Sequence, residues 1–533
     1  MKRKIYYIAA ATLFSMGLSS CNNLDTIPED SYVTADQKEE SVEMNPELAS
    51  AGVVGISAVY PRVMSVYAEA HFDFGWPSLG LMLDSGTADL VSSNIGYNWY
   101  STDVSDYSWG TNTAYVGSMS WYLGYKVIKA ANDVIASIGA EPESAQLQLF
   151  AAQGYANRAY IYFTLAQLYQ YTYVGHESLP CVPLITDLNS DEAALNGAPR
   201  ATVQEVYDQI LSDLNTAIDL LTKSGLPVTE IASTGSKRFV SLGTAYGLRA
   251  RVNLVMNNWQ AAADDAAKAI QTSGCTPLSI EEASRPGFWD SNDHECMWAI
   301  YIQETDRAVT SGIVNFPSMM GSFNSNGYWT VGATRRINKA LYAAIGTNDA
   351  RKGWWLSSSG SSNNLTSAEA KFLAKFSPEG YTQVKFGAYQ NEIGTVTNAN
   401  DYFLMRVEEM YLIQAEATAM AGNPSAGATM LENFIKTYRN PSYTVTASSK
   451  EEVQEECWLQ RRIELWGEGL AYFDLLRLNK GLDRRGGGWE SVWVYNVPAP
   501  LKPILIPNGE MQANKAIGDN NEAWAKPSPV DDI

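Results

Sequence analysis

The stretch Arg461-Arg462-Ile463-Glu464-Leu465-Trp466-Gly467-Glu468-Gly469-Leu470-Ala471-Tyr472-Phe473-Asp474-Leu475-Leu476-Arg477 combines apolar regularity and charge more densely than any other part of the chain. Its apolar residues, together with Leu459 before it, recur at steps of four and three, which predicts one face of an α-helix. Arg461 lies three residues before Glu464, so acids and bases fall within one helical turn of each other. Glu464 and Glu468, one turn apart, also allow a second interpretation, a catalytic pair of carboxylates. The rest of the chain has to decide between scaffold and active site.

The composition is that of a globular protein. A chain of 533 residues with 46% hydrophobic content can bury one large core or two smaller ones. Its formal net charge of -20 and the lack of a basic cluster argue against nucleic acid as a partner, because phosphate binding needs a basic surface. An anionic glycan is disfavoured less strongly, since a local patch suffices to bind it. The 30 Tyr and 15 Trp supply rigid amphipathic contact area, although packing between helices accounts for most such rings.

The N-terminus predicts export and a lipid anchor. Lys2, Arg3 and Lys4 precede an apolar run over residues 5–18, which is too short to span a bilayer. The following Leu18-Ser19-Ser20-Cys21 resembles a bacterial lipobox. We therefore expect residues 1–20 to be a signal peptide and Cys21 to carry the lipid, with acyl chains such as palmitate. An ordinary secretory signal followed by an incidental cysteine is the alternative.

The other cysteines do not form a metal motif. Cys181, Cys275, Cys296 and Cys457 are widely spaced and contain no Cys-x-x-Cys pair, which excludes the common zinc patterns. One disulfide among them stays open in an oxidising envelope, but a chain of this size does not need such a link. Four buried thiols are the simpler interpretation.

The sequence contains almost no catalytic or metal-binding motif. The chain contains no Gly-x-Ser-x-Gly, phosphate loop or Gly-x-Gly-x-x-Gly, and no cofactor is expected. His294-Glu295 begins like a zinc-protease helix, but Trp298 stands where the second His is needed. Residues 290–293 hold three calcium-type ligands without the glycine and final Glu of an EF-hand loop. A glycosidase needs two carboxylates across a cleft, whereas Glu464 and Glu468 lie on a patterned helix beside bases, which favours a structural role.

Helical segments occur in pairs around short breaks. We expect helical hairpins over about residues 118–273 and 405–480, roughly the size of tetratricopeptide units but without a strict period. Thr202 followed by Glu205 predicts a capping box at the start of one helix. We expect residues 21–48, with the lipidated cysteine at their start, to be a polar tether that leads into the fold. The predicted fold class is mostly α, a tetratricopeptide-like scaffold of helical hairpins carrying an irregular, loop-rich ligand-binding region.

Two irregular regions, about residues 84–113 and 275–400, mix turn residues with aromatics and are the places where we expect function. Sugar binding asks for flat aromatic faces together with amide and carboxylate groups on a preformed surface. Two loops offer that mixture, and Trp99 and Trp329 are their strongest single candidates; the alternative is that these rings cover the scaffold or face a transporter. The candidate ligand-binding residues are Tyr97, Asn98, Trp99, Tyr100 and Asp103 in the first loop, and Phe323, Asn324, Asn326, Tyr328 and Trp329 in the second.

Several segments, in this order, resemble the SusD/RagB family of outer-membrane lipoproteins from Bacteroidetes. They are Cys21 with Leu24-Asp25 and Pro28; Trp121-Tyr122 through Asn132; residues 156–163; residues 199–207 with Asp213-Leu214 and Ala217-Ile218; residues 406–417; the opening stretch; and Ile506-Pro507 with Glu510 and Asn514. The resemblance runs from Cys21 to the C-terminus. Residues 466–469 and the Gly486 to Gly488 turn are less typical, which leaves the subfamily open.

The resemblance implies one SusD-like domain over residues 49–533 and no catalytic residues. It implies a cell-surface protein of the outer membrane that takes part in polysaccharide utilisation and nutrient uptake. Such a protein binds an oligosaccharide and delivers it to a SusC-like TonB-dependent transporter in the same membrane. A peptide ligand, as in RagB-like proteins, is the alternative. A glycoside hydrolase is a third hypothesis from another class.

Overall fold

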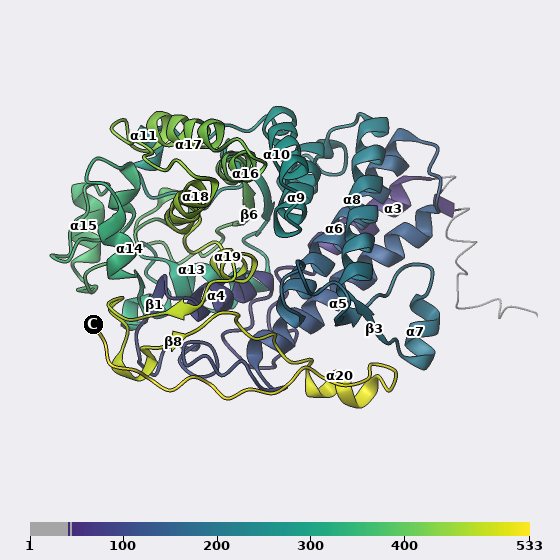
Figure 1. Ribbon diagram of the computed structural model, residues 1–533, viewed down its shortest axis with the longest axis horizontal. Coiled ribbons are helices and arrows are strands. Elements are labelled where there is room, and N and C mark those ends of the chain that lie inside the picture. The colour runs from purple at the N-terminus through teal and green to yellow at the C-terminus, as the bar shows by residue number, and fades with distance from the viewer. Residues whose placement is uncertain (1–40, 43–44) are drawn as a thin grey trace, which may run out of the picture.

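The computed structural model describes residues 41–42 and 45–533 of the chain, and Figure 1 shows the arrangement of its helices. The predicted signal peptide over residues 1–20 and the predicted lipid-bearing Cys21 lie outside the described residues. In the part of the chain that is described, no helix combines the length and the apolar character needed to cross a membrane.

Long helices packed in antiparallel pairs build one side of the molecule and its top in Figure 1. Helix α6 packs against α5 and α8, and α10 packs against α9 and α16. The predicted fold class, a mostly α scaffold of helical hairpins, is therefore confirmed. The helices concerned are α3 (Glu47–Ser57), α5 (Tyr115–Ile138), α6 (Ala145–Tyr169), α8 (Val203–Ser224), α9 (Leu242–Val255), α10 (Trp259–Ser273), α16 (Val407–Met420), α17 (Pro424–Tyr438) and α18 (Lys450–Glu464).

The predicted capping box begins α8. The Thr202 hydroxyl accepts from the Glu205 N–H at 3.2 Å, while the Glu205 carboxylate accepts from the Thr202 N–H at 2.7 Å. The box satisfies two backbone donors that the first helical turn would otherwise leave unpaired.

Short helices and two-stranded antiparallel ribbons make up the rest of the fold. Most of them lie on the other side of the molecule in Figure 1, whereas one ribbon packs against α6 and α8. The ribbons pair β1 (Leu90–Ser92) with β5 (Arg335–Ile337), β2 (Pro180–Pro183) with β3 (Arg200–Thr202), β4 (Cys296–Ile300) with β6 (Tyr402–Arg406), and β7 (Leu482–Asp483) with β8 (Asn496–Val497). The remaining α-helices are α4 (Trp76–Gly86), α7 (Ser190–Asn196), α11 (Ile280–Ala283), α12 (Arg307–Thr310), α13 (Phe316–Met320), α14 (Lys339–Ala344), α15 (Ser367–Leu373), α19 (Ala471–Arg477) and α20 (Asn508–Ala513). Single 3-10 turns are η1 (Val228–Glu230), η2 (Ser236–Arg238), η3 (Tyr328–Val331), η4 (Ala350–Trp354), η5 (Tyr389–Asn391) and η6 (Ser491–Trp493).

The opening stretch, residues 461–477, does not form the continuous helix that its apolar spacing predicted. Helix α18 ends at Glu464 and α19 begins at Ala471, and between them Gly467 and Gly469 adopt φ of 80° and 78°. Residues with side chains rarely take this left-handed conformation, so the two glycines break the helix. A Cβ on Gly469 would also lie 2.7 Å from the Cα of Gly80 in α4. The correction is therefore one of local geometry. The apolar residues are still buried or partly buried, but they come from two helices and from the turn between them, which carries Trp466.

A buried ion cluster joins this stretch to the rest of the fold. Glu464, with 0% of its surface exposed, accepts from Arg439 at 2.8 Å and lies 3.1 Å from an Arg406 nitrogen and 3.2 Å from an Arg351 nitrogen. The other members are contributed by β6, α16, the end of α17, the turn between α18 and α19, and the segments around η4 and residue 385. The cluster comprises Arg351, Lys385, Arg406, Arg439, Asp349, Glu408, Glu464 and Glu468.

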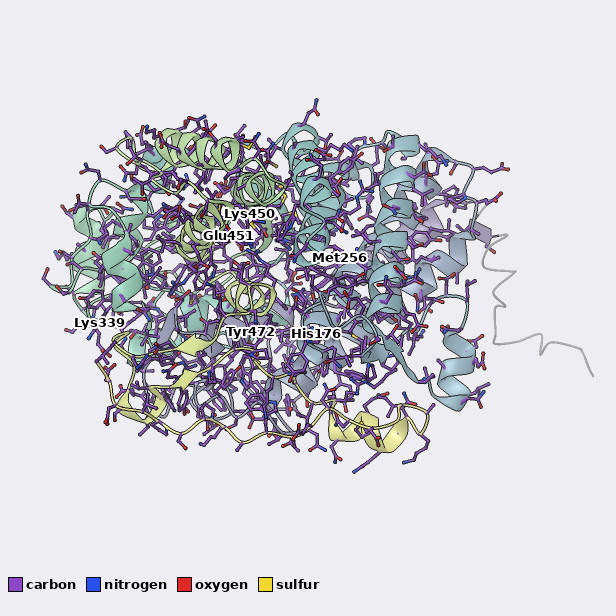
Figure 2. The ribbon with its side chains drawn as sticks, in the orientation of Figure 1. His176, Met256, Lys339, Lys450, Glu451 and Tyr472 are labelled. Carbon is purple, nitrogen blue, oxygen red and sulfur yellow. The ribbon has the colours of Figure 1, made fainter. Side chains whose placement is uncertain are left out.

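One continuous core of buried apolar side chains extends from Val42 to Ile517 and includes residues of both the long helices and the ribbons. Tyr472, near the centre of Figure 2, is a member of this core and is 1% exposed. The loops described next are therefore carried by a rigid body rather than by a separate lobe.

Candidate ligand-binding site

The β1–β5 ribbon brings the two candidate loops together. Leu90 is opposite Ile337 and Ser92 is opposite Arg335, so the segment after β1 and the segment before β5 leave the ribbon at the same end. The first segment carries Trp99 and the second carries η3. Loops more than 200 residues apart in sequence thus form one surface, which the spacing of motifs along the chain did not reveal.

Four rings from three segments form an aromatic cluster, which we define as His71, Tyr97, Trp99 and Tyr328. The ring centroids of His71 and Trp99 are 4.8 Å apart, those of Trp99 and Tyr328 are 6.1 Å apart, and those of Tyr97 and Tyr328 are 6.2 Å apart. Nδ1 of His71 also forms a hydrogen bond with the Tyr328 hydroxyl. Aromatic rings attract one another at these separations, so the cluster is held in one geometry without a ligand.

Solvent exposure within the aromatic cluster increases from a buried base to an exposed rim. Tyr328 is 7% exposed, His71 and Trp99 are partly exposed, and Tyr97 is 57% exposed. Burial raises the pKa of the Tyr328 phenol, so its hydroxyl remains neutral at physiological pH. Exposed apolar rings of this kind mark binding surfaces, because water solvates them poorly.

Three of the five candidates in the first loop shape the loop instead of lining its surface. Asn98 is buried; its amide donates to the Ser93 carbonyl at 2.9 Å and its Oδ1 accepts from Arg335 at 3.0 Å. Tyr100 is 0% exposed and its hydroxyl lies 2.9 Å from that of Ser78. The prediction that these two side chains contact ligand is therefore wrong for this structure: both face inward.

Asp103 is also a structural residue. Its carboxylate accepts from the backbone N–H of Tyr115, the first residue of α5, where four donors would otherwise lack partners. Burial raises the pKa of Asp103 to about 7, and the nearby Asp106 adds to the rise, although the bond from Tyr115 opposes it. Its predicted contact with a ligand is replaced by a role at the start of a helix.

The second loop shows the same division. Trp329 is only 2% exposed and lies in a small internal cluster, 4.8 Å from the Phe376 ring, with its Nε1 donating to Asn324 Oδ1 at 2.7 Å. Phe323 is 2% exposed in the same cluster, and Asn324 is 3% exposed. These three predictions are corrected because distant residues cover the side chains. Asn326 remains partly exposed, and its amide donates to the Gly312 carbonyl at 3.1 Å.

His71 is a member of the site that sequence reasoning missed. It precedes Phe72 and Phe74 in a segment rich in aromatic residues, and that density was the available signal. Its place in the cluster follows from Asp73, whose carboxylate accepts from the backbone N–H groups of Val66 and Tyr67 at 2.7 and 2.8 Å. These bonds close the loop over residues 66–73 and present His71 to Trp99.

The carboxylates of the opening stretch do not form a catalytic pair. Burial works to raise the pKa of Glu464, but Arg439, Arg406 and Arg351 together outweigh it and hold the pKa well below its ordinary value. The pKa of Glu468 is lowered as well, by Arg406 and Lys385 acting against burial. A general acid needs a raised pKa and access to substrate, so both carboxylates are structural.

A partly open cavity of about 60 Å³ lies between α4, α6, α9, β6 and the α18–α19 segment. The carboxylates that line it are all in ion pairs: Glu409 with Arg251, Asp474 with Arg461 and Arg477, and Glu468 with Lys385 and Arg406. The cavity is therefore a poor alternative to the aromatic cluster.

The fold and the site together define a class: a scaffold of helical hairpins that presents an aromatic surface on loops. Comparison with known proteins agrees. Residues 79–254 match a family described as "Starch-binding associating with outer membrane", and residues 289–526 match the SusD family. The chain belongs to the SusD/RagB family.

Individual relatives are distant in sequence and close in fold. A SusD-like protein of Formosa agariphila is 23% identical in an alignment of length 528 that covers 91% of this chain and 93% of that protein. A SusD-like carbohydrate binding protein from Bacteroides vulgatus superposes with a TM-score of 0.70 at 21% identity, covering 89% of this chain and 97% of its own. Surface glycan-binding protein A from Bacteroides thetaiotaomicron, solved with laminarihexaose, gives a TM-score of 0.65 at 18% identity, covering 89% and 99%.

Proposed function

We propose that this protein captures an oligosaccharide at the outer surface of the outer membrane through its aromatic cluster. The observation that carries the proposal is the convergence of His71, Tyr97, Trp99 and Tyr328 into one preformed, partly exposed surface. The apolar face of a pyranose packs on such rings, and the rim groups of the same loops can hydrogen bond to its hydroxyls. The solved relative that contains laminarihexaose supports a glycan as the ligand class.

The rest of the proposed pathway follows from the family. The protein would be anchored by lipid at Cys21 and would deliver its ligand to a SusC-like TonB-dependent transporter. A carrier that only hands over its ligand needs a binding surface and no catalytic group. The ion-paired state of Glu464 and Glu468 fits that requirement, because neither is set up as an acid or a base.

Affinity electrophoresis tests the proposal directly. The soluble protein lacking residues 1–21 is run in gels containing single polysaccharides, neutral and acidic, with laminarin among them. We expect retardation by at least one neutral polysaccharide and no release of reducing ends. Trp99→Ala should weaken binding to that polysaccharide about 30-fold, which corresponds to roughly 2 kcal/mol for a central aromatic contact.

A matched control separates binding from folding. Trp259 is also a partly exposed tryptophan, but it lies at the start of α10, outside the cluster. Trp259→Ala should leave retardation unchanged, and both variants should melt close to the parent. Retardation that is equal in the parent and in Trp99→Ala would remove the aromatic cluster as the site. Binding of peptides with silence on every glycan would replace the ligand class, and reducing-end release would identify a hydrolase.

A further inference from the structure

A second pair of partly exposed rings lies outside the aromatic cluster. Trp289 and Tyr389 meet edge to face with their centroids 5.7 Å apart. Trp289 precedes β4, and Tyr389 is the first residue of η5. Both belong to the irregular region where the sequence predicted a ligand surface, and neither takes part in the site described above.

An amide and a carboxylate, groups that can hydrogen bond to sugar hydroxyls, lie beside this pair. The Trp289 Nε1–H donates to the exposed Asn391 at 3.1 Å, and the Tyr389 hydroxyl donates to the exposed Glu304 at 3.0 Å. A carboxylate and an amide have more hydrogen-bonding capacity than these single bonds use. The pair therefore combines aromatic surface with acceptors and donors for hydroxyl groups, the mixture that sugar recognition requires.

The backbone around the pair is held in an unusual conformation. Gln390 and Asn391 have φ of 54° and 56°, a left-handed region that residues with side chains enter at a cost in free energy. Two consecutive residues of this kind persist only where the surrounding contacts fix them. Here the turn places Asn391 against the indole of Trp289.

A buried carboxylate fixes the other side of the pair. Asp401 accepts from the backbone N–H groups of Ser291 at 2.9 Å and Ile302 at 2.7 Å, and its own N–H donates to the Trp289 carbonyl at 2.9 Å. One residue thus ties the segment carrying Trp289 to the segment leading to Glu304. The pair is preformed, so a ligand would not have to order it.

The loop that follows Tyr389 is bonded to the loop that carries Tyr328. The Gly394 N–H donates to the Phe323 carbonyl at 2.6 Å, and the Ser325 N–H donates to the Thr395 carbonyl at 2.8 Å. The two groups of rings are therefore mounted on directly connected loops. A long glycan offers repeated copies of the same sugar face, and added contacts along one chain raise its apparent affinity.

We propose that Trp289 and Tyr389 form a second carbohydrate subsite that takes a further pyranose unit of a neutral polysaccharide. Neutral sugars are favoured because Glu304 stands beside the rings and would repel an acidic sugar. The subsite rests on the proposed function, since it serves the same ligand class. It adds affinity for long chains, while short chains depend on the aromatic cluster alone.

Chain length provides the test. The polysaccharide that retards the parent protein, and short oligosaccharides cut from it, are titrated by isothermal calorimetry into the parent and into Trp289→Ala, Tyr389→Ala and Trp99→Ala. Trp289→Ala and Tyr389→Ala should weaken polysaccharide binding about three- to tenfold, the usual range for one aromatic contact, and leave the short oligosaccharide within twofold. Trp289→Ala combined with Trp99→Ala should remove the residual polysaccharide binding that Trp99→Ala retains.

Each outcome decides one of the two proposals. A parent protein that binds no glycan overturns the proposed function and the subsite with it. A parent that binds through Trp99, with polysaccharide affinity unchanged in both Trp289→Ala and Tyr389→Ala, overturns the subsite alone. If Trp289→Ala lowers the melting temperature of the protein, Glu304→Gln tests the subsite in its place. Glu304 is exposed, and its substitution leaves both rings in position. We expect about threefold weaker polysaccharide binding in Glu304→Gln, and unchanged binding overturns the subsite.

Discussion

Replacing Glu464 by Gln should destabilise the whole protein, because it removes one negative charge from the centre of the buried ion cluster. The cluster holds four cations and four carboxylates, all in ion pairs. Glu464 is 0% exposed and touches Arg351, Arg406 and Arg439. Glu464→Gln keeps the shape and leaves one excess positive charge in the interior.

Loss of one partner from a buried ion pair costs about 3–5 kcal/mol. For roughly 500 ordered residues, at about 2.1 cal/mol/K each, the entropy of unfolding is near 1 kcal/mol/K, so Tm should fall by about 3–5 °C. Because the three arginines hold the pKa of Glu464 below its unfolded value, the ionised group stabilises the fold above the unfolded pKa. That stabilisation is lost as pH falls through the lower folded pKa. The gap between parent and variant should therefore persist at neutral pH and narrow in strong acid.

Differential scanning calorimetry between pH 3 and pH 7 measures the effect, with Glu451→Gln as the matched control. Glu451 lies on the same helix, where Figure 2 labels it beside Lys450, the first residue of α18, and its side chain is 68% exposed. Its substitution should leave Tm within about 1 °C, since exposed ion pairs contribute little. Glu464→Gln with an unchanged Tm at pH 7 would refute the structural role assigned to the cluster. A folded Glu464→Gln protein that had lost glycan binding would refute its separation from the site.

Two further predictions follow from burial. Trp329→Ala should lower the free energy of unfolding by about 3–5 kcal/mol, because the Trp329 ring fills an internal cluster. Trp99→Ala should lower it far less, since Trp99 is partly exposed. Urea unfolding measures both variants, and equal losses would contradict the burial assigned to Trp329. Asp84 is buried and its pKa is raised to about 7 although the N–H groups of Gly469 and Ala471 bond to it. The folded protein therefore binds an extra proton between about pH 4 and pH 7, and stability falls as pH rises through that window. In Asp84→Asn this decline should be smaller, and identical pH profiles of unfolding in parent and variant would exclude the effect.

The helical part of the fold could be predicted from the sequence because it depends on local residue patterns. Apolar residues at helical spacing predicted the hairpins, and Thr202 with Glu205 predicted the start of α8 at the residue where it begins. The same spacing failed between Glu464 and Ala471. There the conformation is decided by Gly467 and Gly469 and by the close approach of Gly80, a tertiary contact that periodicity does not record.

The loops that form the site could be predicted from their composition, but the exposure of each side chain could not. Tyr97, Trp99 and Tyr328 were predicted as ligand contacts from their loops, and the structure joins them, but their contact with a glycan stays a prediction. Trp99 and Trp329 looked equivalent in sequence, since each follows turn residues and a tyrosine. Only the fold shows that Phe376 covers Trp329 while Trp99 stays partly open. Side chains contributed from far along the chain decide exposure, and for that reason single-sequence reasoning could not rank the two.

The β1–β5 ribbon has a consequence for how such a surface can be altered. Its register, Leu90 opposite Ile337 and Ser92 opposite Arg335, clamps the stems of both site loops to the core, and Arg335 secures one of them further through Asn98. Loop tips beyond these stems can change in length or sequence without disturbing the helices behind them. New ligand preferences could therefore be engineered by exchanging the segments around Trp99 and Tyr328 as a cassette, provided that the four stem positions and Asn98 are retained. The ribbon would hold the ends of different recognition loops in the same position.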